Sequence, residues 1–235
     1  MKKVELREMS QKDLKDLPFS SDKCITPVCR LAYVNLLTPR KPKDEEGKED
    51  ETKKAKYSVC MIFDTESDFT NMRNLLHATL VKKFGAGYPK KYLEKPFRDG
   101  NDRIDEETGK VKPEFKDKIF VNCNTMRKPF IGVKVAGKTH EINDPDLVYS
   151  GMYARVAVNT YSYNSKGNKG ASFGLFRVLK QADGPKIEYE VSSDKLFGGV
   201  DDSDDNPFAH DDTITDEDVK NSRNNDDKDD LSGLI

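Results

Sequence analysis

The clearest strand pattern in the chain is the run YARVAVNTYSYNSKGNKGASFGLFRVL, residues 153–179. Side chains alternate between the two faces of a strand, so one face receives Ala154, Val156, Val158, Thr160 and Ser162. The other face receives Tyr153, Arg155, Ala157, Asn159, Tyr161 and Tyr163. Turn glycines and two lysines follow in the segment SKGNKG, residues 165–170, and a second apolar run returns after it. The pattern predicts a β-hairpin with one small apolar face and one aromatic, polar face.

The aromatic face of this hairpin has the composition of a platform for single-stranded nucleic acid. Flat rings stack on any base, for about 1–3 kcal/mol per base, while nearby cations neutralise phosphates. We therefore expect binding with little sequence preference. The candidate residues on the hairpin are Tyr153, Arg155, Tyr161, Tyr163, Lys166, Lys169, Phe173 and Arg177. Neighbouring loops offer Phe97, Arg98, Arg127 and Lys128 as an extension of the groove. The alternative is that the tyrosines pack beneath flexible loops and expose only their hydroxyl groups.

Strands dominate the rest of the chain. Runs of β-branched and aromatic residues predict strands at 25–37, 57–63, 118–124, 130–136, 148–163 and 171–180, the first two as a hairpin. Apolar residues at helical spacing predict one helix over 65–83, which begins at Thr65 or Ser67 and ends at Gly85. The high charge of segment 40–56 predicts a mobile loop, and segment 85–116 is expected to form an irregular loop. We expect a mainly β fold, a small barrel or sandwich with one inserted helix.

The charge of the chain is divided unequally along its length. Residues 201–235 carry 13 acidic and 3 basic residues, a net charge of −10, and the remaining 37 basic and 29 acidic residues give residues 1–200 a net charge of +8. A basic body attracts polyanions, whereas a run of like charges does not fold on itself. We therefore expect an N-terminal segment at 1–24, a domain at 25–190 and a disordered acidic tail at 191–235.

Composition argues against several other classes of protein. No apolar run approaches the roughly 20 residues that cross a bilayer, and no apolar segment follows the basic N-terminus, so we expect a cytosolic protein. The four cysteines are dispersed and predict buried free thiols rather than a zinc site. Neither a phosphate-binding loop nor a dinucleotide motif is present, and we expect no cofactor.

Several short motifs, taken in their order along the chain, resemble the single-stranded DNA-binding proteins of tailed phages. They are LLTPR at 36–40, KPFRDG at 95–100, FVNCN at 120–124, YSGMYARV at 149–156 and YSYNSKGNKG at 161–170. The resemblance covers most of residues 25–185. It implies an OB-fold barrel with an inserted helix and places Tyr153, Arg155, Tyr161, Tyr163 and Lys169 on a groove hairpin.

The same resemblance implies a role for the acidic tail. In that family the tail contacts replication and recombination proteins, which for this chain implies a polymerase, a helicase or a recombinase as partner. The chain departs from the family pattern in its highly charged loop at 40–56 and in its end, DDLSGLI, which has no terminal aromatic residue. We therefore expect Asp229, Asp230, Leu234 and Ile235 to form the element that docks on partners.

Two other functions fit part of the sequence. Asp99, Asp102, Asp105, Glu106 and Glu107 are close together, and a metal-dependent nuclease could use such carboxylates to hold divalent ions. No suitably placed general base accompanies them. A single-strand annealing protein would use the same basic and aromatic surface, although the sequence has no long helical element of the kind that builds rings or filaments.

Overall fold

In the part of the chain that the structure describes, nine strands form a single hydrogen-bonded sheet. The computed structural model describes residues 22–42, 48–106, 108–165 and 167–187. The strands are β1 (Lys23–Ile25), β2 (Cys29–Arg40), β3 (Lys56–Asp64), β4 (Arg98–Asp99), β5 (Lys118–Thr125), β6 (Phe130–Val135), β7 (Lys138–Glu141), β8 (Tyr153–Ser165) and β9 (Asn168–Ala182). The helices are α2 (Thr70–Phe84) and α3 (Lys91–Glu94), with 3-10 turns at Gly100–Asp102 and Pro113–Phe115. Among the described residues, no helix is long and apolar enough to span a bilayer.

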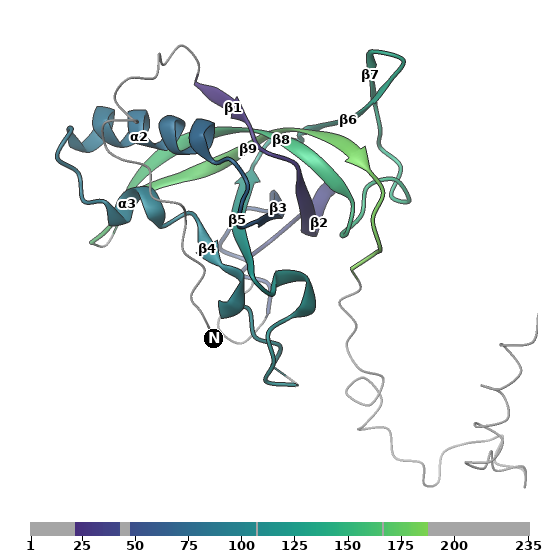
Figure 1. Cartoon of the computed structure of the whole chain (residues 1–235), viewed down its shortest axis with the longest axis horizontal. Helices are drawn as coiled ribbons and strands as arrows, with labels where there is room; N and C mark the ends of the chain where they lie inside the picture. Colours follow the sequence, from purple (N-terminus) through teal and green to yellow (C-terminus); the bar gives the residue numbers. More distant parts are fainter. Residues whose placement is uncertain (1–21, 43–47, 107, 166, 188–235) are drawn as a thin grey trace, which may run out of the picture. The chain divides into compact units, whose positions relative to one another are not determined.

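Five of the strands close into a barrel (Figure 1). Going around it, β8 pairs with β2, β2 with β3, β3 with β5, β5 with β9, and β9 with β8 again. All of these pairs are antiparallel except β5 with β9, which is parallel. This arrangement is the five-stranded Greek-key barrel of the OB-fold. The expected fold class is therefore confirmed.

The barrel interior receives one face of each strand, as the alternation of the sequence predicts. On β8, Ala154, Val156 and Val158 have no exposed surface, and Val59 and Val121 are equally deep on β3 and β5. These residues belong to one continuous apolar cluster. The hairpin of β2 and β3 also forms as predicted.

Helix α2 packs its apolar residues against the barrel, next to β8 (Figure 1). Met72, Leu76 and Leu80, which recur at helical spacing in the sequence, are fully buried, and the helix ends at Gly85 as expected. The expected start at Thr65 or Ser67 is wrong. The helix begins at Thr70, whose backbone N–H donates to the Asp68 carboxylate at 2.9 Å. Asp68 is therefore the side chain that satisfies a free backbone donor at this end of the helix.

The segment 85–116 differs from the irregular loop that was expected. It contains α3, the short strand β4 and both 3-10 turns. Two single aromatic residues fix it to the body: Phe97 is 8 % exposed in the main core, and Phe115 is completely buried in a second apolar cluster. Single buried aromatic residues show neither the helical nor the strand periodicity of apolar residues, so the sequence pattern did not predict that this segment is ordered.

Strand β9 contains a β-bulge at Phe176. Arg177 pairs with Ala157 and Leu175 with Val158, so Phe176 has no opposite residue on β8. One extra residue reverses which face of the sheet each following side chain occupies. Before the bulge Phe173 and Leu175 point into the core, and after it Val178 does. Both Phe176 and Arg177 lie exposed on the outer face.

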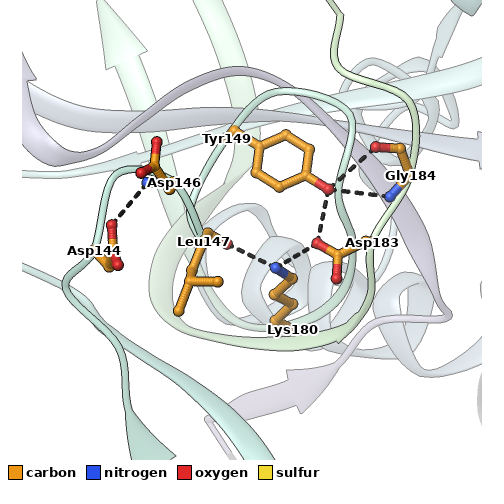
Figure 2. Close-up of polar contacts among 7 residues, drawn as sticks. All are labelled: Asp144, Asp146, Leu147, Tyr149, Lys180, Asp183 and Gly184. Atoms are coloured by element: carbon orange, nitrogen blue, oxygen red, sulfur yellow. Dashed lines mark hydrogen bonds and ion pairs between the residues drawn. The ribbon is translucent and has the colours of Figure 1, made fainter.

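The chain remains bound to the barrel after β9 ends. We call residues 183–187 the exit strap. Figure 2 shows the Tyr149 hydroxyl donating to the Asp183 carboxylate at 2.8 Å and accepting from the Gly184 N–H at 3.2 Å. Lys180 lies between the Asp183 carboxylate, at 2.6 Å, and the Leu147 carbonyl, at 3.0 Å. Further along, the Ile187 N–H donates to the Ser150 carbonyl at 2.8 Å.

The strap ends close to the division of the chain into two units, residues 1–188 and 189–235. The second unit and residues 1–21 lie outside the described residues. The predicted N-terminal segment, apart from its last three residues, therefore lies outside them, and so does the acidic tail. The domain boundaries at 24 and 190 remain predictions.

Candidate nucleic-acid interface

The outer face of the β8–β9 hairpin carries the aromatic and polar side chains that the sequence assigns to it. Tyr161 is 45 % exposed, Arg155 and Asn159 are exposed, and Tyr163 is half-buried. The tyrosines are therefore not enclosed beneath loops. The Arg155 guanidinium is partly used within the protein, because it donates to the Thr26 carbonyl at 3.2 Å.

Small residues on β9 lie opposite these large side chains. Tyr163 pairs with Gly170, Tyr161 with Ser172, and Asn159 with Gly174. A Cβ atom on Gly170 would come within 2.7 Å of the Tyr163 hydroxyl oxygen, and one on Gly174 within 2.2 Å of the Asn159 Oδ1. These side chains therefore lie down across β9, over the space that the glycines leave.

Cations surround the tip of the hairpin. The Lys95 ammonium lies 5.4 Å from the centre of the Tyr163 ring and also contacts Asn168. Lys91, Lys95 and Lys169 line a cavity of about 450 Å³ between α3 and the hairpin tip. Lys95 belongs to the motif KPFRDG at 95–100, but it was not among the predicted binding residues.

A continuous row of polar and small residues crosses the outside of the barrel from this hairpin. In register from strand to strand it consists of Asn159, Gly174, Asn124, Ser58 and Asn35. Each barrel strand contributes one member, and the Asn35 amide donates to the Ser58 hydroxyl at 3.3 Å. Amide and hydroxyl groups both donate and accept hydrogen bonds, so the row presents mixed polar groups along one path.

The row leads to a cavity of about 640 Å³ on the outer face of β3 and β5. Its lining includes Tyr33, Ser58, Cys60, Arg103, Asn122 and Asn124. Strands β3 and β5 are the second and third strands of the barrel, the face on which OB-folds bind oligonucleotides. Neither Tyr33 nor Arg103 was predicted from the sequence.

Arg103 is held at this cavity by aromatic rings. Its guanidinium carbon lies 4.7 Å from the centre of the Phe120 ring, 5.8 Å from that of Phe115 and 5.9 Å from that of Tyr33. Its buried Nε makes no hydrogen bond to any described residue. The buried Nε cannot reach a ligand in solution, but a guanidinium held in place by stacking can offer its terminal N–H groups to a phosphate.

The sequence profile of a family described as "Enterobacter phage Enc34, ssDNA-binding protein" matches residues 22–207. The chain belongs to this family. The family consists of single-stranded DNA-binding proteins, so the expectation of a binding protein rather than an enzyme is confirmed by membership. The resemblance to phage single-stranded DNA-binding proteins is confirmed as well. None of the curated proteins matches the sequence.

Solved structures of the single-stranded DNA-binding protein from bacteriophage Enc34 share the fold. The structure in complex with ssDNA is 17 % identical and has a TM-score of 0.54, over 71 % of this chain and 90 % of that chain. The structure described without DNA is 15 % identical and has a TM-score of 0.52, over 75 % of this chain and 90 % of that chain. At sequence identities this low, the comparison shows a shared fold.

Two residues that the sequence predicts to bind DNA, Phe173 and Phe97, lie in the core instead. Phe173 is completely buried and Phe97 is 8 % exposed, with their ring centres 5.8 Å apart in the core. Neither ring can stack on a base. The error at Phe173 arises from the bulge, because Phe173 and Arg177 share a face only in a regular strand.

The other predicted residues are distributed over a wider surface. Arg98, Arg127, Lys128, Lys169 and Arg177 are exposed. Tyr153 is 37 % exposed at the far end of β8, where its ring lies against Gly184 of the exit strap. Lys166 and the four tail residues Asp229, Asp230, Leu234 and Ile235 lie outside the described residues.

The cysteines are free thiols, as predicted, and three of the four are buried. Burial raises the pKa of the Cys60 thiol to about 12 and that of the half-buried Cys24 to about 11. Across the part of the chain that the structure describes, no three His, Cys, Asp or Glu side chains lie together as metal ligands would. Of the acids considered for a nuclease, Glu107 lies outside that part.

Proposed function

We propose that this protein binds single-stranded DNA without sequence preference along the outside of its barrel. The strand would run from Tyr161 and Tyr163 at the hairpin, over the polar row, to Arg103 and Tyr33 at the β3–β5 cavity. The observation that carries the proposal is the continuous register that joins these two aromatic and cationic sites across all five barrel strands. Membership of a single-stranded DNA-binding family supports the choice of ligand.

Each part of this surface has a distinct role in the proposal. The exposed Tyr161 ring stacks on a base, and such stacking tolerates any sequence. The lysines around the hairpin tip and Arg103 neutralise phosphates. The amides of the row bind base edges or sugars without a fixed donor pattern, since an amide offers both donor and acceptor. The proposed surface binds the strand and carries out no chemistry on it.

A fluorescence anisotropy titration with single-stranded DNA, single-stranded RNA and duplex DNA tests the proposal. We expect the tightest binding to single-stranded DNA, and a roughly 5- to 150-fold loss of affinity in Tyr161→Ala from the loss of one stacked base. Val135→Ala is the matched control, because Val135 is also exposed but lies on the β6–β7 hairpin. Equal affinity of Tyr161→Ala and the wild-type protein would contradict the proposed path.

We further propose that the acidic segment 201–235 competes with DNA for this surface. Its 13 carboxylates are tethered to a body with a net charge of +8, at an effective concentration on the order of millimolar for a short flexible linker. The exit strap supports this arrangement. Ile187 packs against the apolar cluster of Ala32, Cys60, Ile62, Phe115 and Phe120 that borders the β3–β5 cavity, together with Tyr33.

Bound DNA would release the segment for protein partners. We assign the role to phage DNA replication and recombination in the host cytoplasm, with a polymerase, helicase or recombinase docking at Asp229, Asp230, Leu234 and Ile235. Deleting residues 201–235 should tighten DNA binding at moderate salt and abolish capture of such a partner. An unchanged or weaker DNA affinity in the deletion variant would rule out the competition.

A further inference from the structure

An exposed aromatic side chain that the sequence did not predict as a binding residue lies on the outside of the barrel, beside Arg177. Phe176 is 39 % exposed because the bulge in β9 turns it outward. A large apolar ring on an otherwise charged surface costs free energy in water, about 25 cal/mol for each Å² left exposed. The bulge also removes one backbone pairing from the sheet. Both costs point to a use for the ring outside the core.

Two cations flank the Phe176 ring. The Lys23 ammonium lies 5.0 Å from the ring centre and the Arg177 guanidinium carbon 5.2 Å from it. The Arg177 guanidinium carbon also lies 5.3 Å from the centre of the Phe130 ring, so two rings hold this side chain in place. The group therefore combines one exposed ring with two cations from β1 and β9, of which the Lys23 ammonium is also paired with the Asp22 carboxylate at 2.7 Å.

The ring lies next to the end of the polar row. Lys23 pairs in register with Asn159, the first member of the row, and Phe176 follows Gly174 by two residues, about 7 Å along a strand. A strand of nucleic acid that crosses the row can therefore reach the ring without leaving the surface. Ile25, 62 % exposed and paired with Ala157, forms the outer border of the group.

We propose that Phe176, Lys23 and Arg177 form a second base-stacking site for the DNA strand beyond the Asn159 end of the row. The inference rests on the proposed function and extends the DNA path to the β1 side of the barrel. A base stacks on the exposed ring and displaces the Lys23 ammonium, whose flexible stem lets it exchange the exposed Asp22 carboxylate for the adjacent phosphate. Arg177, fixed between two rings, binds the next phosphate with its planar donor group.

The absence of tryptophan from the chain makes this site directly measurable. Phe176→Trp introduces a single tryptophan at the site, and a base stacked on it quenches its fluorescence. Val135→Trp places a single tryptophan at another exposed position, on β6 of the β6–β7 hairpin, as the matched control. We expect saturable quenching by oligo(dT) in the first variant and none in the second. Phe176→Leu should bind the same oligonucleotide roughly 5- to 150-fold more weakly.

The outcomes separate this inference from the proposed function. If Tyr161→Ala weakens binding while Phe176→Trp shows no quenching and Phe176→Leu binds normally, the second site is refuted and the groove stands. If neither Tyr161→Ala nor Phe176→Leu changes the affinity, the proposed path itself fails. If Phe176→Leu instead changes the sedimentation coefficient of the free protein and leaves DNA affinity unchanged, the ring packs against a second copy of the chain and the inference is overturned.

Discussion

Arg103 provides the sharpest test of the β3–β5 cavity, because it contributes both to the fold and to the proposed path. Replacing it with methionine keeps an apolar stem of similar length over the three rings and removes the charge. The guanidinium lies closest to Phe120, at 4.7 Å, in a partly buried position. Losing a cation–π contact of this kind costs about 0.5–1 kcal/mol. The fold should therefore survive with a melting temperature lowered by about 1–4 °C.

The effect on binding should be larger than the effect on stability. A hydrogen bond from a charged group contributes about 1.5–3 kcal/mol, so Arg103→Met should bind single-stranded DNA roughly 10- to 150-fold more weakly. Each phosphate contact to a single strand also adds about 0.7 to the magnitude of the slope of log affinity against log salt. The slope for Arg103→Met should therefore be shallower by about 0.7 than that of the wild-type protein.

The assay is an anisotropy titration with oligo(dT) at four or more salt concentrations, with Arg103→Lys as the matched variant. Lysine keeps the charge and loses the planar stacking geometry, so it should restore the salt slope and only part of the affinity. If Arg103→Met keeps the wild-type slope, Arg103 contacts no phosphate and serves only to hold the loop against Phe115. In that case the path ends before the cavity.

Three further predictions follow from burial and charge. Phe173→Ala should lower the free energy of unfolding by about 3–5 kcal/mol, as measured by urea denaturation, because the Phe173 ring is completely buried. A variant with wild-type stability and weaker DNA binding would show that the ring lies at the groove and not in the core. In the native protein a thiol reagent should modify Cys24 first and should modify Cys60 only after unfolding, as followed by mass spectrometry. Rapid modification of Cys60 in the native protein would instead show that the β3–β5 face is open. The Lys180 ammonium, and then the Tyr149 hydroxyl, hold the pKa of the Asp183 carboxyl below its ordinary value of 3.8. That carboxylate therefore stabilises the exit strap above about pH 4 and loses its contribution as the pH falls through the lowered pKa. Asp183→Asn should remove this part of the acid dependence of the melting temperature, and an identical acid profile in the two proteins would contradict the assignment.

Strand alternation predicted the two faces of the β8–β9 hairpin and favoured a small barrel or sandwich, while the OB-fold barrel was implied by the resemblance to phage proteins. On β8 the period of two separates Val156 and Val158 from Tyr161 without exception, and the burial of these residues agrees. The signal is strong because a closed barrel has only an inside and an outside, and a shift of one residue would expose the whole core face. The same reasoning located the helix, whose buried positions repeat every three to four residues.

The residues that the sequence did not predict depend on contacts between distant segments. Arg103 lies in a stretch of mixed charge, and only the packing of Phe115 against Tyr33 and Phe120 brings it to the cavity. Tyr33 itself adopts a positive φ of 49°, at a point where the register between β2 and β3 shifts. Neither the shift nor the long-range aromatic packing has a local sequence pattern.

The outer face of strand β9 carries small residues at positions where a sheet usually prefers β-branched ones, and the packing of the β8–β9 hairpin gives the reason. Gly170 and Gly174 lower the intrinsic stability of β9, since glycine is unfavourable in strands. Glycine has no side chain to pack on the sheet, but here the Tyr163 and Asn159 side chains of the neighbouring strand lie across the two glycines and supply this packing. Side chains that lie flat in this way leave the face above them open. The pattern of large residues on one strand and small ones on the next therefore makes a shallow, continuous track, which is the path that we propose for single-stranded DNA.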